Sequence, residues 1–216
     1  MKKIKIVIIS LMLLSFIVVG ISFAFLNDVI PIHFGADWQP DQYGSKYFIL
    51  IIPFISLIIG GSMLLIAKYG KVSDNYRKYL LLTCALIEVV LLVVTGIMVS
   101  YSLVYVEDNP PFDVSKIMMI VLGTLFIIMG NFMPKIEKNR TLGFKIKWSM
   151  YNEVTWQKTH RLAGFMGVIV GIIIFASGLF FNDMINFIVL MVMLGIFMIV
   201  TTLASYRYYK EETAKC

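Results

Sequence analysis

Residues 79–104 read YLLLTCALIEVVLLVVTGIMVSYSLV, an apolar run with one charged side chain, Glu88. A helix needs roughly 20 apolar residues to cross a hydrocarbon core of about 30 Å. The run meets that length and therefore predicts a membrane-spanning helix. Helix is the only open structure available at that depth, because each lipid-exposed backbone amide must be hydrogen-bonded within its own segment.

Five more apolar runs lie outward from this one, at about residues 6–26, 47–67, 116–133, 161–181 and 185–205. The 216 residues are 59% hydrophobic and 15% charged, whereas soluble domains are roughly 45–50% apolar and about 25% charged. The first run is longer than the core of a secretory signal, so we expect it to remain as a span. We predict an all-α polytopic membrane bundle of six transmembrane helices, and we exclude a soluble enzyme, a disordered regulator and a secreted disulfide scaffold.

Lys and Arg are distributed unevenly among the loops. All but Lys46 and Lys116 of the 19 basic residues lie at the amino terminus, in the segments 68–78 and 134–161, or in the tail from residue 206. These segments alternate along the bundle, and cytoplasmic loops carry the excess of Lys and Arg. We expect both termini to be cytoplasmic, an arrangement that explains the net charge of +6 without a nucleic-acid partner. The opposite side carries most of the acidic loop residues: Asp28, Asp37, Asp41, Glu107, Asp108, Asp113 and Asp183.

We interpret the chain as one membrane domain made of three successive stretches. Residues 1–67 contain the first two spans and an external loop, 27–46, and residues 68–133 contain spans three and four. Residues 134–216 contain a cytoplasmic loop, spans five and six, and a short tail.

The external loop 27–46 has more varied chemistry than a connector requires, since prolines restrict its backbone and glycines permit turns. A hydrogen-bonded cap on the bundle and a contact surface for an extracellular ligand are both open interpretations. One His with two Asp could hold a cation, but no close ligand pair such as His-x-x-x-His is present, so we predict no metal site. The candidate contacts for a ligand are His33, Asp37, Trp38, Asp41, Tyr43 and Lys46.

The cytoplasmic loop 134–160 is longer than a helix connection requires. Asn152 is expected to cap a helix that enters the fifth span, with Glu153 at its positive end. Glu153, Trp156 and His160 recur at steps of three and four residues and therefore share a helix face.

Two interpretations of this loop stay open: a membrane-surface segment anchored by Trp148 and Trp156, and a docking surface for a cytoplasmic protein. Its basic residues can meet anionic headgroups, each contributing about 1 kcal/mol. The candidate residues are Asn139, Arg140, Gly143, Lys145, Trp148, Glu153, Trp156, Lys158, His160 and Arg161.

Four short stretches carry a resemblance to a known family: NRTLGFK at 139–145, WQKTHR at 156–161, IPIHF at 30–34 and DQYGSK at 41–46. With the external pair preceding the cytoplasmic pair, and with six spans around them, they resemble the SdpI-type integral membrane immunity proteins over nearly the full chain. The chain departs from that family at residues 144–148, which read FKIKW where Ile-Arg-Thr-Pro-Trp is more usual. A lysine there lacks the planar two-pronged donor of arginine.

The resemblance implies a bacterial cytoplasmic-membrane protein that is not an enzyme, uses no cofactor and protects against a secreted antimicrobial peptide toxin. The partners that it implies are the lipid bilayer, the toxin outside the cell and a cytoplasmic repressor held at the membrane.

Glu88 lies near the middle of the third span, where an ionised carboxylate is costly. No intramembrane Lys, Arg or His is available as its counter-ion. A protonated interhelical hydrogen bond is one interpretation, and a small proton-coupled transporter or exporter is the alternative function. The polar residues at comparable depth are Ser56, Ser62, Thr124 and Ser177.

Two further patterns bear on packing and on enzymatic function. Gly164, Gly167 and Gly171 have the spacing of close helix contact, which we assign to packing within the bundle. An intramembrane protease would need His-Glu-x-x-His or a nucleophile with a histidine partner, and the sequence contains neither arrangement.

Overall fold

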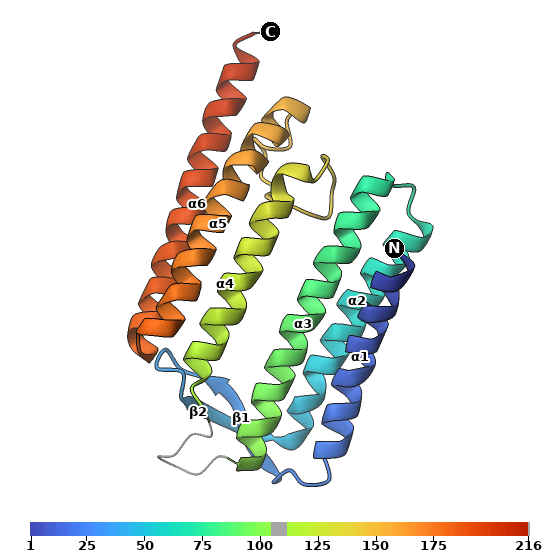
Figure 1. Cartoon of the computed structure of the whole chain (residues 1–216), viewed down its shortest axis with the longest axis vertical. Coiled ribbons are helices and arrows are strands. Elements are labelled where there is room, and N and C mark those ends of the chain that lie inside the picture. Colours follow the sequence, from blue (N-terminus) through green and yellow to red (C-terminus); the bar gives the residue numbers. More distant parts are fainter. Residues whose placement is uncertain (105–111, 216) are drawn as a thin grey trace. The chain divides into compact units, whose positions relative to one another are not determined.

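The computed structural model describes residues 1–104 and 112–215. It contains six helices long and apolar enough to cross a membrane, which confirms the predicted bundle. They are α1 (Lys2–Ser22), α2 (Ile51–Tyr69), α3 (Asp74–Val104), α4 (Val114–Phe132), α5 (Glu153–Phe180) and α6 (Asp183–Thr213) (Figure 1). A short 3-10 turn, η1 (Lys46–Leu50), precedes α2, and a second, η2 (Met133–Lys135), follows α4. Glu107 and Asp108, predicted for the external side, lie outside the described residues.

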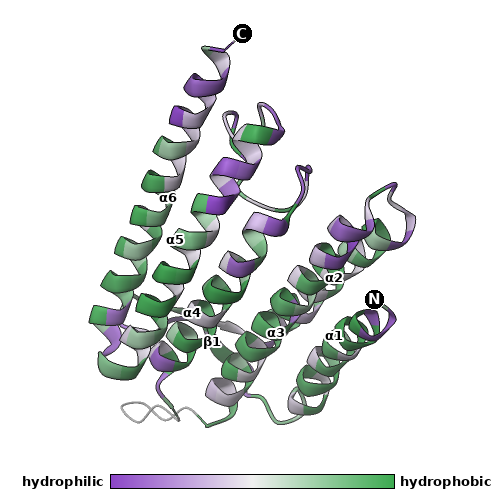
Figure 2. Cartoon of the chain, turned by 45° about the horizontal axis from the view of Figure 1, so that its top comes forward, coloured by the Kyte–Doolittle hydropathy of each residue, from purple (hydrophilic) through white to green (hydrophobic). Residues whose placement is uncertain are grey.

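Large apolar side chains remain exposed along the helices, including Ile21, Ile58 and Ile199. Hydrophobic residues occupy most of each helix, and hydrophilic residues gather mainly near the helix ends (Figure 2). Exposed apolar surface on this scale is unfavourable in water and is compatible with contact to lipid chains. The helices therefore present the surface expected of a multi-pass membrane protein.

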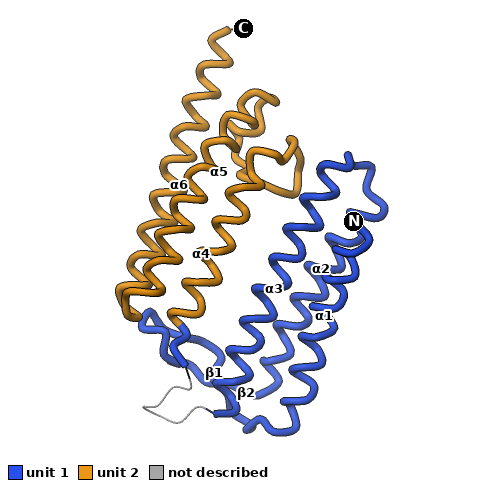
Figure 3. The backbone as a smooth tube through the Cα atoms, viewed as in Figure 1, with its two compact units in different colours: residues 1–114 blue, residues 115–216 orange. Residues whose placement is uncertain are grey.

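The chain divides into two compact units, residues 1–114 and 115–216 (Figure 3). In the first unit, α1, α2 and α3 each contact the other two helices. A β-hairpin lies at the end of this unit opposite to the amino terminus (Figure 1). The second unit contains α5, α6 and nearly all of α4.

The hairpin is formed by β1 (Val29–Phe34) and β2 (Pro40–Ser45), which pair antiparallel. The turn is closed by the Gly35 N–H, which donates to the Gln39 carbonyl at 2.8 Å. Trp38 adopts a positive φ of 60° in this turn. The sequence analysis did not predict these strands, although Val29–Phe34 is rich in the β-branched and aromatic residues that favour them.

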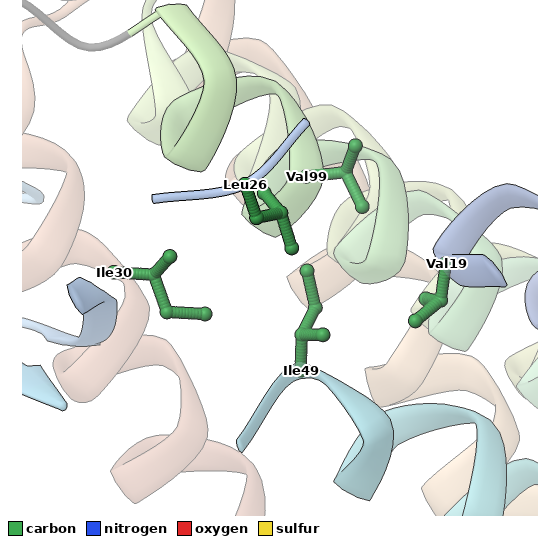
Figure 4. Packing of buried hydrophobic residues seen from close by; sticks show 5 residues of the cluster. All are labelled: Val19, Leu26, Ile30, Ile49 and Val99. Atoms are coloured by element: carbon green, nitrogen blue, oxygen red, sulfur yellow. The ribbon is translucent and has the colours of Figure 1, made fainter. Parts of the chain in front are cut away.

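A buried apolar cluster joins the hairpin to the helices of the first unit. Ile30 of β1, Ile49 of η1, Val19 of α1 and Val99 of α3 pack together with Leu26 (Figure 4). The Phe34 ring also meets the Tyr101 ring of α3 edge to face, with centroids 5.1 Å apart. The hairpin is thus held by side chains from all three helical segments around it.

In the second unit, glycines allow α4 and α5 to approach closely. A Cβ on Gly130 would lie 2.7 Å from the Gly164 carbonyl oxygen, and one on Gly171 would lie 2.7 Å from the Gly123 oxygen. Gly167 also faces α4, since a Cβ there would lie 3.4 Å from the Gly130 Cα. The predicted role of the α5 glycines in packing within the bundle is confirmed.

Candidate functional site

The motif loop, defined here as residues 136–152, joins η2 to α5 and leads into the first turns of that helix. The Asn152 side chain accepts a hydrogen bond from the Thr155 N–H at 2.8 Å, and the Thr155 hydroxyl accepts one from the Asn152 N–H at 3.1 Å. This reciprocal pair is a capping box, which satisfies amides that a helix start leaves without partners. The predicted cap at Asn152 is confirmed.

Trp156 and His160 form a stacked pair beneath the motif loop. Their ring centroids are 3.8 Å apart with an interplanar angle of 21°, and both residues are buried. The Trp156 indole N–H donates to the Ile136 carbonyl at 2.8 Å, across the loop. The prediction that these two residues share a helix face is confirmed, whereas Glu153 is exposed.

Hydrogen bonds define the state of the His160 ring. The Phe144 N–H donates to Nε2 at 3.0 Å, and a backbone amide can only donate, so Nε2 carries no proton. The proton therefore lies on Nδ1, which is 2.9 Å from the Trp156 carbonyl oxygen. Both nitrogens of the neutral ring are used to hold the loop on α5.

Gly143 lies where the backbone of the motif loop passes close to this pair. Its φ is +98°, a region that side-chain-bearing residues rarely adopt. A Cβ at Gly143 would collide with His160 Nε2 and would lie 3.2 Å from the Trp156 ring. The glycine of the motif is therefore required by backbone conformation and by space together.

The interpretation of Trp156 as an anchor in the lipid headgroup region is wrong. Trp156 is fully buried and hydrogen-bonded within the unit, because the loop folds back over the start of α5. For the same reason Trp156 and His160 are inaccessible to a docking protein. Trp148 packs instead against the Tyr206 ring of α6, with centroids 4.9 Å apart.

The other motif residues have two kinds of role. Asn139 shapes a turn, because its side-chain oxygen accepts the N–H groups of Thr141 and Leu142 at 2.8 and 2.7 Å. Arg140 and Lys145 are exposed, and the Lys145 ammonium donates to the Arg140 carbonyl at 3.1 Å. The sequence analysis missed the buried Ser149, whose hydroxyl donates to the Phe144 carbonyl at 2.7 Å.

The end of α6 also belongs to this site, although residues from 206 were expected to form a tail. The helix continues to Thr213 because the motif loop supplies contacts for it. The rings of Tyr151 and Tyr209 meet edge to face at 5.0 Å. The Lys158 ammonium of α5 lies 3.4 Å from the Glu212 carboxylate.

The hairpin forms a second site, in the first unit. His33 Nδ1 lies 2.6 Å from an Asp41 carboxylate oxygen, whereas Asp37 accepts the Gln39 N–H within the turn. Lys46 pairs with Asp28 at 2.9 Å and closes the base of the hairpin. Among the residues described, no group of three or more His, Cys, Asp or Glu side chains is placed to hold a metal ion. Tyr43 is exposed on β2, and Trp38 is partly buried in the turn.

Glu88 lies inside the first unit, on α3. The Ser56 hydroxyl of α2 donates to its Oε2, so one of the four polar residues expected at this depth is a partner. The other three bond to carbonyls of their own helices: Ser62 to Ile59, Thr124 to Ile120 and Ser177 to Ile174. Glu88 Oε1 has no hydrogen-bond partner among the described residues.

Gly60 of α2 makes room for the Glu88 carboxyl group. A Cβ at Gly60 would lie 2.6 Å from Glu88 Oε1 and 2.7 Å from the Met12 sulfur of α1. Beside this point, the hydroxyls of Ser15 and Thr95 are 3.1 Å apart and tie α1 to α3. The carboxyl group is thus enclosed by three helices.

Residues 135–205 match the SdpI/YfhL protein family, and residues 10–57 match a domain of unknown function, DUF1648. The first match covers the motif loop, α5 and most of α6, and the second covers most of α1 and the hairpin. The chain is 27% identical to the immunity protein SdpI of Bacillus subtilis (strain 168) over 211 residues, which are 98% of each chain. No solved structure matches. The motifs quoted from the sequence lie within these matches, which together support the SdpI-type family and a multi-pass bacterial membrane protein.

Proposed function

We propose that this protein gives its cell immunity to a secreted antimicrobial peptide toxin and does so from the cytoplasmic membrane. The observation that carries the proposal is the similarity to an immunity protein along 98% of both chains. The hairpin and the motif loop are both ordered segments held by buried side chains. Each lies at the end of a set of membrane-spanning helices. Such segments suit recognition at a membrane surface.

The distribution of charge supports an orientation for the first unit. Lys2, Lys3 and Lys5 begin α1, and Lys68 and Lys71 lie near the connection between α2 and α3, at the end opposite to the hairpin (Figure 1). Because basic segments remain in the cytoplasm, this orientation places the hairpin outside the cell. There it is available to a toxin.

The hairpin offers a mixed surface to such a peptide. The side chains of His33, Asp41 and Tyr43 are exposed, while Ile30 on the other side of β1 is buried against the helices. A rigid support lowers the entropy lost when a partner binds. We assign toxin contact to this exposed side of the hairpin.

Removal of the gene from its own bacterium tests the proposal and does not require the toxin to be identified. The deletion strain is expected to lose viability in the culture supernatant of its parent, and the intact gene is expected to restore survival. A gene carrying His33→Ala, Asp41→Ala and Tyr43→Ala should reach the membrane and restore little survival. A deletion strain that survives as well as its parent overturns the proposal.

The cytoplasmic side carries a second assignment, to a repressor that docks on the motif loop. The surface that favours it joins Tyr151 of the loop to Tyr206 and Tyr209 of α6, where aromatic side chains stay partly exposed beside basic residues. Aromatic residues and Arg are enriched at the centres of protein interfaces. Tyr151→Ala is expected to release the repressor from the membrane fraction and to leave immunity intact.

A further inference from the structure

A pocket of about 410 Å³ lies in the second unit, between residues 134–137 and the first turns of α5. Its volume is within the range of roughly 300–1,000 Å³ that small-molecule sites occupy. Trp156 contributes to its wall, and the charged residues around it include Glu153 and Arg161 of α5. The roles described above for the stacked pair of Trp156 and His160 and for the end of α6 assign no function to this pocket.

The depth of the pocket in the membrane can be inferred from the exposed residues of α5 that follow it in the sequence. Phe165, Ile169 and Ile172 are exposed apolar residues at steps of four and three along the helix, so they form one stripe. Arg161 precedes this stripe by one turn and is also exposed. Since apolar stripes of this kind meet lipid chains, and a long basic side chain at their end reaches the headgroups, the pocket lies at headgroup level.

Of the three charged α5 residues that line the pocket, Glu153 and Arg161 are free to bind a ligand and Lys158 is not. Neither Glu153 nor Arg161 forms an ion pair with a described residue, whereas the Lys158 ammonium is held by Glu211 and Glu212 at 3.6 and 3.4 Å. Glu153 and Arg161 are eight residues apart, about 12 Å along the helix axis. Their flexible side chains can turn toward each other over Gln157, which also lines the pocket.

We propose that this pocket binds the headgroup of an aminophospholipid, with the phosphate at Arg161 and the ammonium at Glu153. In such a lipid the phosphate lies next to the hydrocarbon chains and the ammonium lies farther out. The pocket has the same order, because Arg161 is the nearer of the two to the apolar stripe. An anionic lipid without an amine would bring no cationic group to the Glu153 carboxylate.

The inference is tested with the purified full-length protein in detergent, by native mass spectrometry with phosphatidylethanolamine and with phosphatidylglycerol. We expect the protein to bind the first lipid roughly tenfold more tightly, as one charge-assisted contact would provide. Arg161→Gln should weaken the binding of both lipids, and Arg161→Lys should restore part of it. Glu153→Gln should abolish the preference between them. Arg140→Gln, an exposed arginine of the motif loop outside the pocket, should change neither affinity.

Equal binding of the two lipids that is insensitive to Glu153→Gln would show a general basic surface and would overturn the proposal. The proposal would also be overturned if Arg161→Gln and Arg161→Lys both bound phosphatidylethanolamine with unchanged affinity. Soluble glycerophosphoethanolamine distinguishes a lipid from a free phosphate compound. If it binds as tightly as the lipid, the apolar stripe plays no part and the lipid assignment is wrong.

Discussion

Single residues of the motif loop act through backbone geometry. Gly143 adopts a positive φ over the ring of His160, and His160 in turn accepts the next amide, that of Phe144. At this point one histidine and one glycine hold the loop against α5. Both residues stand out in the sequence, but their contact depends on the loop folding back onto α5.

Gly143→Ala is expected to lower the free energy of unfolding by about 1–3 kcal/mol, because a strained backbone and a collision with His160 coincide. Thermal unfolding in detergent, followed by tryptophan fluorescence, measures the effect. Gly61→Ala is the matched control, since a Cβ at Gly61 meets no atom within 4 Å and the residue lies in a helix. Equal stability of the two variants would contradict the role given to Gly143.

Glu88 is expected to act as an interhelical hydrogen-bond partner. Glu88→Gln keeps a carbonyl oxygen that can accept the Ser56 hydroxyl, so resistance and thermal stability should be retained. Glu88→Ala removes the acceptor and leaves a cavity, and should cost about 1–3 kcal/mol. Resistance assays of both variants make the measurement, with Ser62→Ala, an exposed site on α2, as control. Loss of resistance in a stable, membrane-inserted Glu88→Gln protein would favour proton coupling instead.

At the scale of elements, the hairpin is the part that helix-based reasoning missed. Its strands are short, its turn contains Trp38 at positive φ, and its pairing is interrupted by shifts of register between Pro31 and Phe34. An isolated two-stranded hairpin is marginally stable. This one is stabilised by the apolar cluster of Val19, Leu26, Ile30, Ile49 and Val99, which draws on residues distant in sequence.

Neighbouring residues of β1 allow a matched test of that support. Ile30 is 0% exposed and Val29 is 62% exposed. Ile30→Ala should destabilise the hairpin by about 2–5 kcal/mol, as other buried truncations of this size do, whereas Val29→Ala should have little effect. Limited proteolysis of purified protein reports the difference as faster cleavage between residues 27 and 46. Cleavage at the same rate in both variants would show that the hairpin does not depend on the cluster.

At the scale of the whole molecule, the spans and their charge asymmetry predict the topology. The basic residues recur in alternate segments, and hydropathy alone located all six helices. The expected extent of the helices was less accurate. α5 begins at Glu153, as the predicted cap at Asn152 requires, whereas α6 runs to Thr213 rather than ending near residue 205, because contacts at its polar end extend the helix beyond its apolar portion.

The orientation can be measured with single cysteines in a chain whose Cys84 and Cys216 are replaced by serine. In intact cells a membrane-impermeant thiol reagent should label Tyr43→Cys on the exposed strand β2. It should leave Lys71→Cys and Tyr151→Cys unlabelled until the membrane is permeabilised, because basic segments face the cytoplasm. Labelling of Lys71→Cys from outside would reverse the orientation.

The amino-acid sequence by itself determined the number of spans and the class of fold. Hydropathy and charge act locally along the chain, since each helix satisfies its own backbone hydrogen bonds in lipid. Only the tertiary structure decided that Trp156 is buried, that His33 meets Asp41, that Ser56 meets Glu88 and that the end of α6 packs on the motif loop. Each of these contacts joins residues that come together only when loops fold back and helices pack, and local sequence patterns do not encode which polar groups then meet.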